Sequence, residues 1–94
     1  MNRMYFVYIL MSLKDEQFYI GITEDVKMRF KNHIDGRVVS TRSRRPLKLI
    51  GYEFYWYKKE AGLREKYLKS SDGRKEIRLR YKQTISKLRI DEKS

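Results

Sequence analysis

Cysteine is absent from this chain of 94 residues, and histidine and proline occur once each. Without cysteine there is no disulfide framework, no thiol nucleophile and no cysteine-ligated zinc or iron–sulfur site. The single histidine, His33, excludes any metal site built from several histidines. No apolar run approaches the ~20 residues of a membrane span, and the run at residues 5–11 is too short for a signal peptide. We therefore expect a cytoplasmic protein that contacts no membrane.

Acidic residues are scarce beside basic ones. Lys and Arg number 23 against 12 Asp and Glu, which gives a net charge of +11. This excess favours association with a polyanion, most commonly nucleic acid, through counterion release and electrostatic steering. The hydrophobic content of 40% and the aromatic content of 14% exclude a disordered basic tail. They suffice for one small core, so we expect a single domain at residues 1–90 and a frayed tail at residues 91–94.

Three segments have the composition of β-strands. Residues 5–11 are apolar and rich in aromatic and β-branched side chains, and residues 18–23 follow after a polar turn. The two segments predict an antiparallel hairpin. Residues 47–56 predict a third strand, which Gly51 interrupts.

Helical patterns occupy most of the remaining chain, at residues 25–35, 58–69 and 74–88. Asp25 is a good N-cap for the first of these helices and Gly36 a good stop, with a buried stripe at Val26, Phe30 and Ile34. Residues 37–46 form a loop. The order β-β-α-β-α-α predicts an α+β fold, with a small three-stranded antiparallel sheet flanked by helices.

Several side chains in this framework point to chemistry. Gly21 lies inside the second strand and indicates either a packing glycine at a bulge or a close approach to the backbone. Tyr19 lies on the same face of this strand as Gly21. Arg29 and His33 are four residues apart and share a helix face, either as a phosphate-binding pair or as an ordinary solvated surface. Glu65 borders a buried helix face, where a carboxylate is uncommon unless it binds metal or pairs with a base such as Arg64 or Lys69.

The loop at residues 37–46 is the most basic segment. Its arginines are Arg37, Arg42, Arg44 and Arg45. They could contact phosphates or simply be solvated. The net charge of the chain favours contact with nucleic acid.

Taken together, these residues resemble the GIY-YIG nuclease superfamily, in particular its small stand-alone bacterial members and the N-terminal incision domain of the bacterial excinuclease. Phe6-Val7-Tyr8 and Tyr19-Ile20-Gly21 correspond to the two half-motifs. Arg29 and His33 match the basic residue and the histidine on the helix that follows. The segment 61–69 resembles the helix that carries the family's metal-binding glutamate. The similarity extends over about residues 4 to 82.

The resemblance implies a Mg²⁺-dependent endonuclease that hydrolyses DNA with low sequence specificity or with structure specificity, in DNA repair or recombination. Glu65 would hold Mg²⁺, with Mn²⁺ as a second option. Tyr8 and Tyr19 would meet near the scissile phosphate, one at the attacking water and one at the phosphate, and which does which stays open. Arg29 would stabilise the transition state, and His33 would hydrogen-bond a tyrosine or the water. Gly21 would be structural.

Two positions depart from the family pattern. Phe6 replaces the glycine of the first half-motif, and the asparagine that some branches carry after the glutamate helix has no counterpart, because the chain's asparagines are Asn2 and Asn32. A non-catalytic basic module that binds DNA or RNA and kept the fold is therefore the alternative function. Both a monomer and a weak dimer are compatible with the sequence.

Overall fold

A three-stranded antiparallel sheet forms the centre of the computed structural model, which describes the backbone of residues 3–93 and the side chains of residues 3–91. The strands are β1 (Tyr5–Ser12), β2 (Phe18–Thr23) and β3 (Leu47–Tyr55). Their order in the sheet is β2-β1-β3, so β1 is central and the other two are edge strands. The predicted hairpin and third strand are confirmed.

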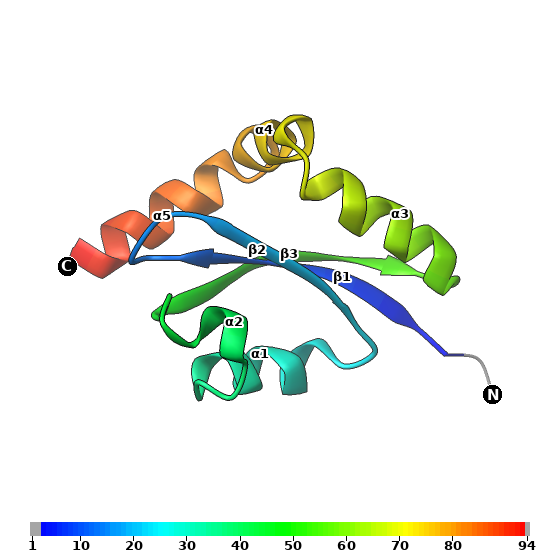
Figure 1. Ribbon diagram of the computed structural model, residues 1–94. Helices are drawn as coiled ribbons and strands as arrows, with labels where there is room; N and C mark the ends of the chain where they lie inside the picture. Colours follow the sequence, from blue (N-terminus) through cyan, green and yellow to red (C-terminus); the bar gives the residue numbers. More distant parts are fainter. Residues whose placement is uncertain (1–2, 94) are drawn as a thin grey trace.

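Helices cover both faces of the sheet (Figure 1). They are α1 (Val26–Ile34), α2 (Val39–Arg42), α3 (Lys58–Leu68), α4 (Ser71–Arg80) and α5 (Lys82–Lys93). α1 and α2 lie on one face, and α3, α4 and α5 lie on the other. The predicted α+β fold is confirmed.

The central strand β1 is buried on both of its faces. Val7, Ile9 and Met11 pack into the core under α3–α5, whereas Tyr8 and Leu10 belong to a second cluster under α1. Strand alternation imposes this division. It explains why the sequence of β1 is apolar without interruption, and it directs Tyr8 toward the α1 face.

The first helix begins and ends as predicted, but its buried face differs. Asp25 caps it by accepting a hydrogen bond from Met28 N at 3.0 Å, and Gly36 follows it with φ of 76°. Ile34, predicted to be buried, is 47% exposed, and the buried residue is His33, which is 3% exposed. The prediction for Ile34 was wrong because α1 turns His33 toward the sheet, where Tyr8 and Thr41 satisfy both ring nitrogens, and the next side chain along a helix points about 100° away.

The segment between α1 and β3 is more ordered than a loop. It contains the single turn α2, and Thr41 within that turn is buried. The sequence shows little apolar periodicity here, because the turn is held by polar contacts rather than by an apolar stripe.

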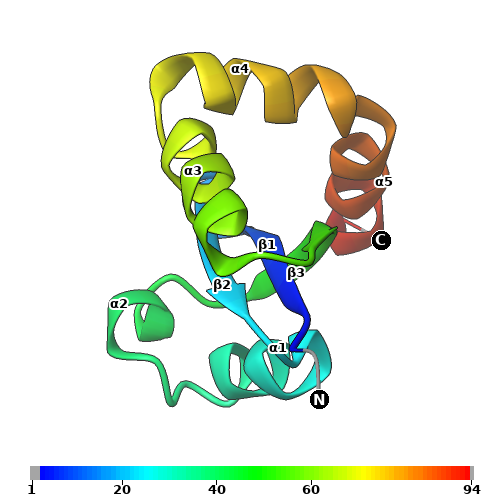
Figure 2. The same cartoon turned by 90° about the vertical axis from the view of Figure 1, so that its right-hand side faces the viewer.

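The predicted third helix is divided in two. α4 ends at Arg80, Tyr81 has φ of −107° and ψ of 24°, and α5 begins at Lys82 in a new direction (Figure 2). The Tyr81 ring packs over Gly51, where an added Cβ would lie 2.5 Å from the ring. α5 continues to Lys93 rather than ending at residue 88, so residues 91–93 of the expected tail are helical, and residue 94 lies outside the described residues.

Candidate active site

Gly21 makes room for the side chain of Tyr8. The two residues are directly opposite in the β1–β2 register. A Cβ added to Gly21 would overlap the Tyr8 hydroxyl and lie 2.5 Å from its Cζ. The predicted close approach at Gly21 is therefore confirmed. The irregularity in the sheet lies elsewhere, between the Ile9 and Leu10 pairs of β1 with β3.

The Tyr8 hydroxyl contacts two side chains of α1. It accepts a hydrogen bond from Arg29 Nε at 3.2 Å and lies 3.1 Å from His33 Nε2. On the other side of its ring, His33 Nδ1 is 2.7 Å from Thr41 Oγ1 on α2. Arg29, Tyr8, His33 and Thr41 thus form one hydrogen-bonded chain across three elements. An ordinary solvated face for Arg29 and His33 is excluded by the burial of the imidazole.

Burial keeps the imidazole of His33 neutral. Desolvation, and second the charge of Arg29, lower the pKa of His33 to about 4 from 6.5. One ring nitrogen then donates a hydrogen bond and the other accepts one. Either Tyr8 donates to Nε2 while Nδ1–H donates to Thr41, or Thr41 donates to Nδ1 while Nε2–H donates to Tyr8. In the second arrangement the Tyr8 oxygen receives two N–H donors.

Tyr19 has a different hydrogen-bond partner. Its hydroxyl donates to Asp15 Oδ2 at 2.9 Å, and Arg44 Nε lies 3.7 Å from the same carboxylate oxygen. Burial and the Asp15 hydrogen bond raise the pKa of Tyr19 above its usual value of 10.0. Tyr8 and Tyr19 are diagonal neighbours, because Tyr19 is opposite Leu10 in the register. Asp15 was not predicted from the sequence, because no periodicity relates a residue in this turn to Tyr19.

The predicted site residues line one cleft of about 500 Å³ that runs over the β2 edge of the sheet. They are the predicted catalytic residues Tyr8, Tyr19, Arg29 and His33, the predicted structural residue Gly21 and the predicted metal ligand Glu65. The cleft is also lined by Lys69, named from the sequence only as a possible partner of Glu65, and by Arg74, which was not predicted. Glu65 belongs to α3, and its carboxylate lies 3.3 Å from Lys69 Nζ. The predicted pairing of Glu65 with a base is therefore confirmed, and the same carboxylate faces the cleft. The catalytic roles stay predictions.

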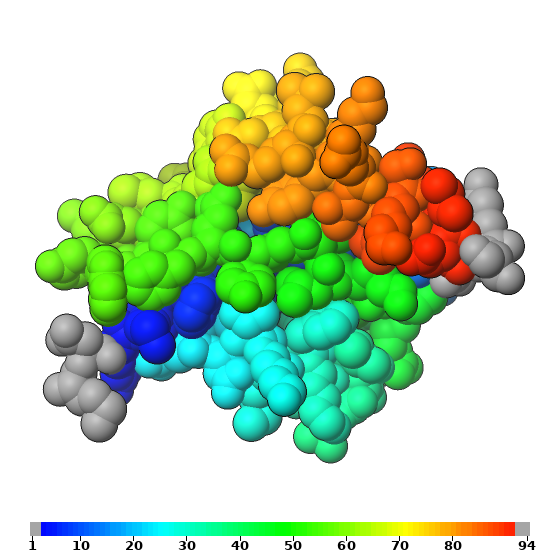
Figure 3. Space-filling view, turned by 180° about the vertical axis from the view of Figure 1, so that it is seen from behind, coloured from blue at the N-terminus to red at the C-terminus, as the bar shows by residue number. Residues whose placement is uncertain are grey.

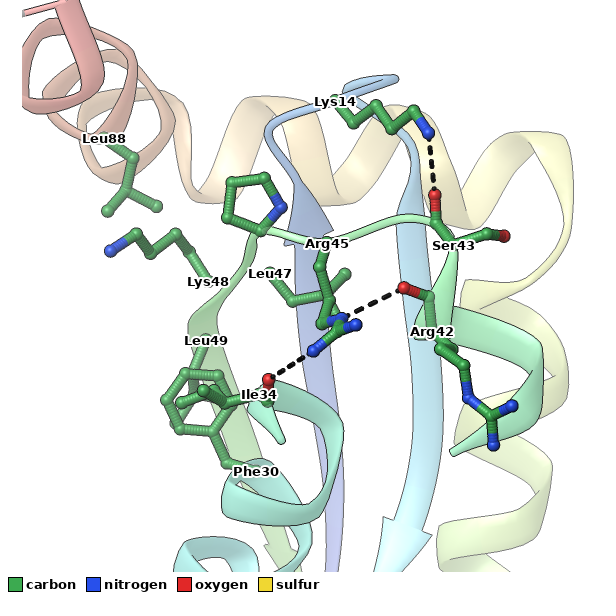
Figure 4. A pocket seen from close by; sticks show the side chains of 11 residues that line it. Lys14, Phe30, Ile34, Arg42, Ser43, Arg45, Leu47, Lys48, Leu49 and Leu88 are labelled. Carbon is green, nitrogen blue, oxygen red and sulfur yellow. Dashed lines mark hydrogen bonds between the residues drawn. The ribbon is translucent and has the colours of Figure 1, made fainter. Parts of the chain in front are cut away.

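Three arginines of the basic segment contact the protein itself: Arg44 pairs with Asp15, and Arg42 and Arg45 bind backbone carbonyls. Arg42 Nε donates to the Gly36 carbonyl at 2.9 Å, and Arg45 donates to the carbonyls of Arg42 and Ile34 (Figure 4). Arg37 is exposed. Among the described residues that line the cleft, none is one of the four predicted DNA-binding arginines. Arg42 and Arg45 instead border a separate groove floored by apolar side chains of α1 and β3. Contact between these arginines and DNA stays a prediction.

The comparison with known families settles the resemblance. Residues 4–78 match the model of the GIY-YIG catalytic domain. The chain belongs to the GIY-YIG nuclease family. The motif residues that carry the resemblance, from Tyr8 to Glu65, are thus the ones that line the cleft.

Stand-alone members of this family are similar over most of their length. The chain is 40% identical over 77 residues to the UPF0213 protein CPE1444 of Clostridium perfringens, covering 81% of this chain and 82% of that protein. It is 37% identical over 76 residues to a UPF0213 protein of Staphylococcus aureus, covering 80% and 92%. The solution structure of the UPF0213 protein BH0048 from Bacillus halodurans matches with 34% identity and a TM-score of 0.49, covering 79% of this chain and 81% of that one.

Two searches within the described residues bear on partners. No helix among residues 3–93 is both long and apolar enough to cross a membrane. The same residues contain no cluster of three or more His, Asp or Glu side chains able to hold a metal ion. Among the described residues that line the cleft, Glu65 is the one carboxylate.

Proposed function

We propose that this chain is a metal-dependent endonuclease that hydrolyses phosphodiester bonds of DNA. The observation that carries the proposal is the contact of the Tyr8 hydroxyl with Arg29 and His33, in a cleft that Glu65 also lines. Phosphodiester hydrolysis can use each of these groups: a hydroxyl for proton transfer, a guanidinium to stabilise negative charge, and a carboxylate to hold a metal. Contacts to phosphates carry no sequence information, so low sequence specificity is expected. DNA repair and recombination are the processes that such an activity would serve.

Tyr8, rather than Tyr19, is the proposed proton acceptor for the attacking water, and it would act as the phenolate after its own proton has left to solvent. With a pKa of about 4, the imidazole of His33 is a poor proton acceptor. We therefore assign His33 a positioning role, in which Nε2–H donates to Tyr8 and Thr41 donates to Nδ1. Together with Arg29, it would place two N–H donors on the Tyr8 oxygen and hold that oxygen in place in the cleft. The Tyr19 hydroxyl is committed to Asp15.

Glu65 is the proposed ligand for Mg²⁺, with Mn²⁺ as the second option. A single carboxylate suits Mg²⁺, which keeps several waters and takes phosphate oxygens of its substrate as ligands. The metal would neutralise charge on the phosphate and lower the pKa of bound water. Arg29, Lys69 and Arg74 supply positive charge around the same cleft. They would hold the phosphate and stabilise the added charge of the transition state.

Nicking of supercoiled plasmid tests the proposal. Cleavage is expected in Mg²⁺ and none in excess EDTA. Tyr8→Phe should lower single-turnover cleavage by about 10²–10⁴-fold, the usual range for lost acid–base catalysis. Tyr19→Phe, which loses only the contact with Asp15, should lower it much less. If the parent protein binds DNA but cuts neither plasmid nor branched or flapped DNA, the non-catalytic binding module is the correct function.

A further inference from the structure

Four aromatic side chains form a continuous strip on the α1 face of the sheet. Phe6 of β1 contacts Tyr52 and Phe54 of β3, with ring centroids 5.8 and 5.6 Å apart, and Phe54 contacts Trp56 at 4.7 Å. Tyr52, Phe54 and Trp56 are 55, 41 and 58% exposed. We call Phe6, Tyr52, Phe54 and Trp56 the aromatic strip.

The fold does not use these exposed rings. Phe30 of α1 packs at the other end of this face, with Leu47 and Leu49. The residues that alternate with the strip, Glu53 and Tyr55, lie on the opposite face, where Glu53 binds Arg64. Figure 3 shows β3 at the surface, between α1 and the helices of the other layer. A contiguous exposed apolar patch of this kind marks an interaction site.

The aromatic strip begins on the strand that pairs with β1 at Tyr8, on the side away from the cleft. In the β1–β3 register, Tyr8 is opposite Tyr52 and Phe6 is opposite Phe54. Directly opposite residues on one face have Cβ atoms about 4.5–5.5 Å apart. From Tyr52 the strip continues along β3 to Phe54 and reaches Trp56, one residue beyond the end of β3, ~13 Å away at ~3.3 Å per residue of extended chain. The Tyr8 hydroxyl leans the other way, over Gly21 of β2, and no described residue of β3 lines the cleft. A nucleic acid in the cleft would therefore have to cross β1 to reach the strip.

We propose that the aromatic strip binds unpaired bases of the nucleic acid cut at Tyr8, so that the preferred substrate has a single-stranded segment. The inference rests on the proposed function for the identity of the polymer in the cleft. Aromatic rings stack on bases of any sequence, whereas bases inside a duplex are already stacked on one another. The β1 and β3 residues on this face carry no carboxylate that would repel phosphates.

The chain provides its own probe, because Trp56 is its only tryptophan. Its fluorescence is measured in EDTA during titration with a single-stranded oligodeoxythymidylate, an abasic strand of equal length and a duplex. Saturable quenching by the oligodeoxythymidylate, and much less by the other two, is expected. Equal quenching by the abasic strand would show that phosphates alone are bound and would overturn the proposal. A response to anionic vesicles or to protein concentration, with none to the oligodeoxythymidylate, would overturn it in favour of a lipid or a second copy.

Two substitutions give the quantitative test. Phe54→Leu should reduce the affinity for oligodeoxythymidylate, relative to the abasic strand, by about tenfold. The matched control is Tyr67→Leu on α3, because Tyr67 is an aromatic residue that is likewise 41% exposed but lies off the strip. It should leave the ratio unchanged. Tyr52→Leu gives a second measurement if Phe54→Leu does not fold. An unchanged ratio in the folded strip variants would overturn the proposal.

Cleavage measured beside binding separates this inference from the proposed function. If base-dependent quenching occurs but no DNA is cut in Mg²⁺, the strip is supported and the proposed catalysis fails. If plasmid is nicked but the strip variants keep the parent's binding ratio, the nuclease is supported and the strip proposal fails.

Discussion

The hydroxyl of Tyr8 occupies the space that a side chain at position 21 would need. The two residues face each other across β1 and β2, and an added Cβ on Gly21 would lie 2.5 Å from Tyr8 Cζ. Glycine at this position therefore determines where the phenol lies relative to Arg29 and His33.

Gly21→Ala should lower cleavage more than it lowers stability. The methyl group would push the phenol away from its two partners, and a displacement of about 1 Å can cost ~10²-fold in rate. Overpacking would cost about 1–3 kcal/mol of stability. Single-turnover cleavage and thermal unfolding measure the two effects. Gly62→Ala is the control, because a Cβ there meets nothing within 4 Å, and an alanine in a helix should stabilise by ~0.5–1 kcal/mol. If Gly21→Ala cuts DNA at the rate of the parent protein, Gly21 does not determine the position of the Tyr8 phenol.

The buried imidazole of His33 should make stability fall in mild acid. The folded-state pKa of about 4 lies below the ordinary value of 6.5. Between these values the unfolded chain binds a proton that the folded protein does not, so stabilisation present above pH 6.5 is lost as pH falls toward 4. The loss is roughly 3 kcal/mol at about 1.36 kcal/mol per pH unit.

The single histidine makes this prediction directly measurable. An NMR titration of the imidazole reports its pKa without assignment, and urea unfolding between pH 6.5 and 4 reports the stability. His33→Gln is the control, and its free energy of unfolding should fall less over this interval. If the free energy of unfolding falls equally with pH in the parent and in His33→Gln, the histidine does not titrate as its burial requires.

Sequence patterns predicted the elements better than the contacts between them. The apolar run of β1, the Asp25 cap and the motif residues were enough to place Tyr8, Arg29 and His33 near one another. The burial of His33 was not predictable, because it depends on Thr41 in a turn with no apolar period. The division at Tyr81 was not predictable either, since the apolar spacing continues through it and the cause is the packing over Gly51, thirty positions earlier in the chain.

Arg64 joins three elements, and removing it should destabilise the fold. Its guanidinium donates to both carboxylate oxygens of Glu53 on β3, at 2.9 and 3.0 Å, and also to Glu76 on α4. Hydrogen bonds from Arg64 and Tyr55 outweigh burial and hold the pKa of Glu53 below its usual value. Arg64→Ala would leave two partly buried carboxylates facing each other. We expect the free energy of unfolding to fall by about 2 kcal/mol or more, which lies between the usual effects of breaking an exposed and a buried ion pair.

Chemical denaturation measures this loss. Lys87→Ala is the control, because its pair with Asp91 on α5 is highly exposed and should contribute less than ~0.5 kcal/mol. The double variant Arg64→Ala with Glu53→Gln should recover part of the loss, since it removes one of the two repelling charges. Equal stability of Arg64→Ala and the parent would show that solvent screens the network completely.

Glu65→Gln and Lys69→Met should change cleavage and binding in opposite directions. If Glu65 is the Mg²⁺ ligand, its carboxylate would repel phosphate until the metal neutralised it, so Glu65→Gln should abolish cleavage while metal-free DNA binding stays equal or becomes slightly tighter. Lys69 Nζ lies 3.3 Å from that carboxylate and would compete with a metal for it. Lys69→Met should therefore bind DNA more weakly, with a salt slope smaller by about 0.9 for one lost phosphate contact.

The same competition between Lys69 and a metal predicts how the Mg²⁺ requirement of cleavage changes in Lys69→Met. Bound DNA should still be cut by Lys69→Met, and half-maximal cleavage should need less Mg²⁺ than in the parent, because no ammonium group neutralises Glu65. Affinity against the logarithm of salt concentration and single-turnover cleavage against Mg²⁺ measure both effects. Lys87→Met removes the same charge from α5, outside the residues that line the cleft, and should leave the Mg²⁺ requirement unchanged. If Glu65→Gln still cuts DNA, the carboxylate is only the structural partner of Lys69, and the metal must bind elsewhere.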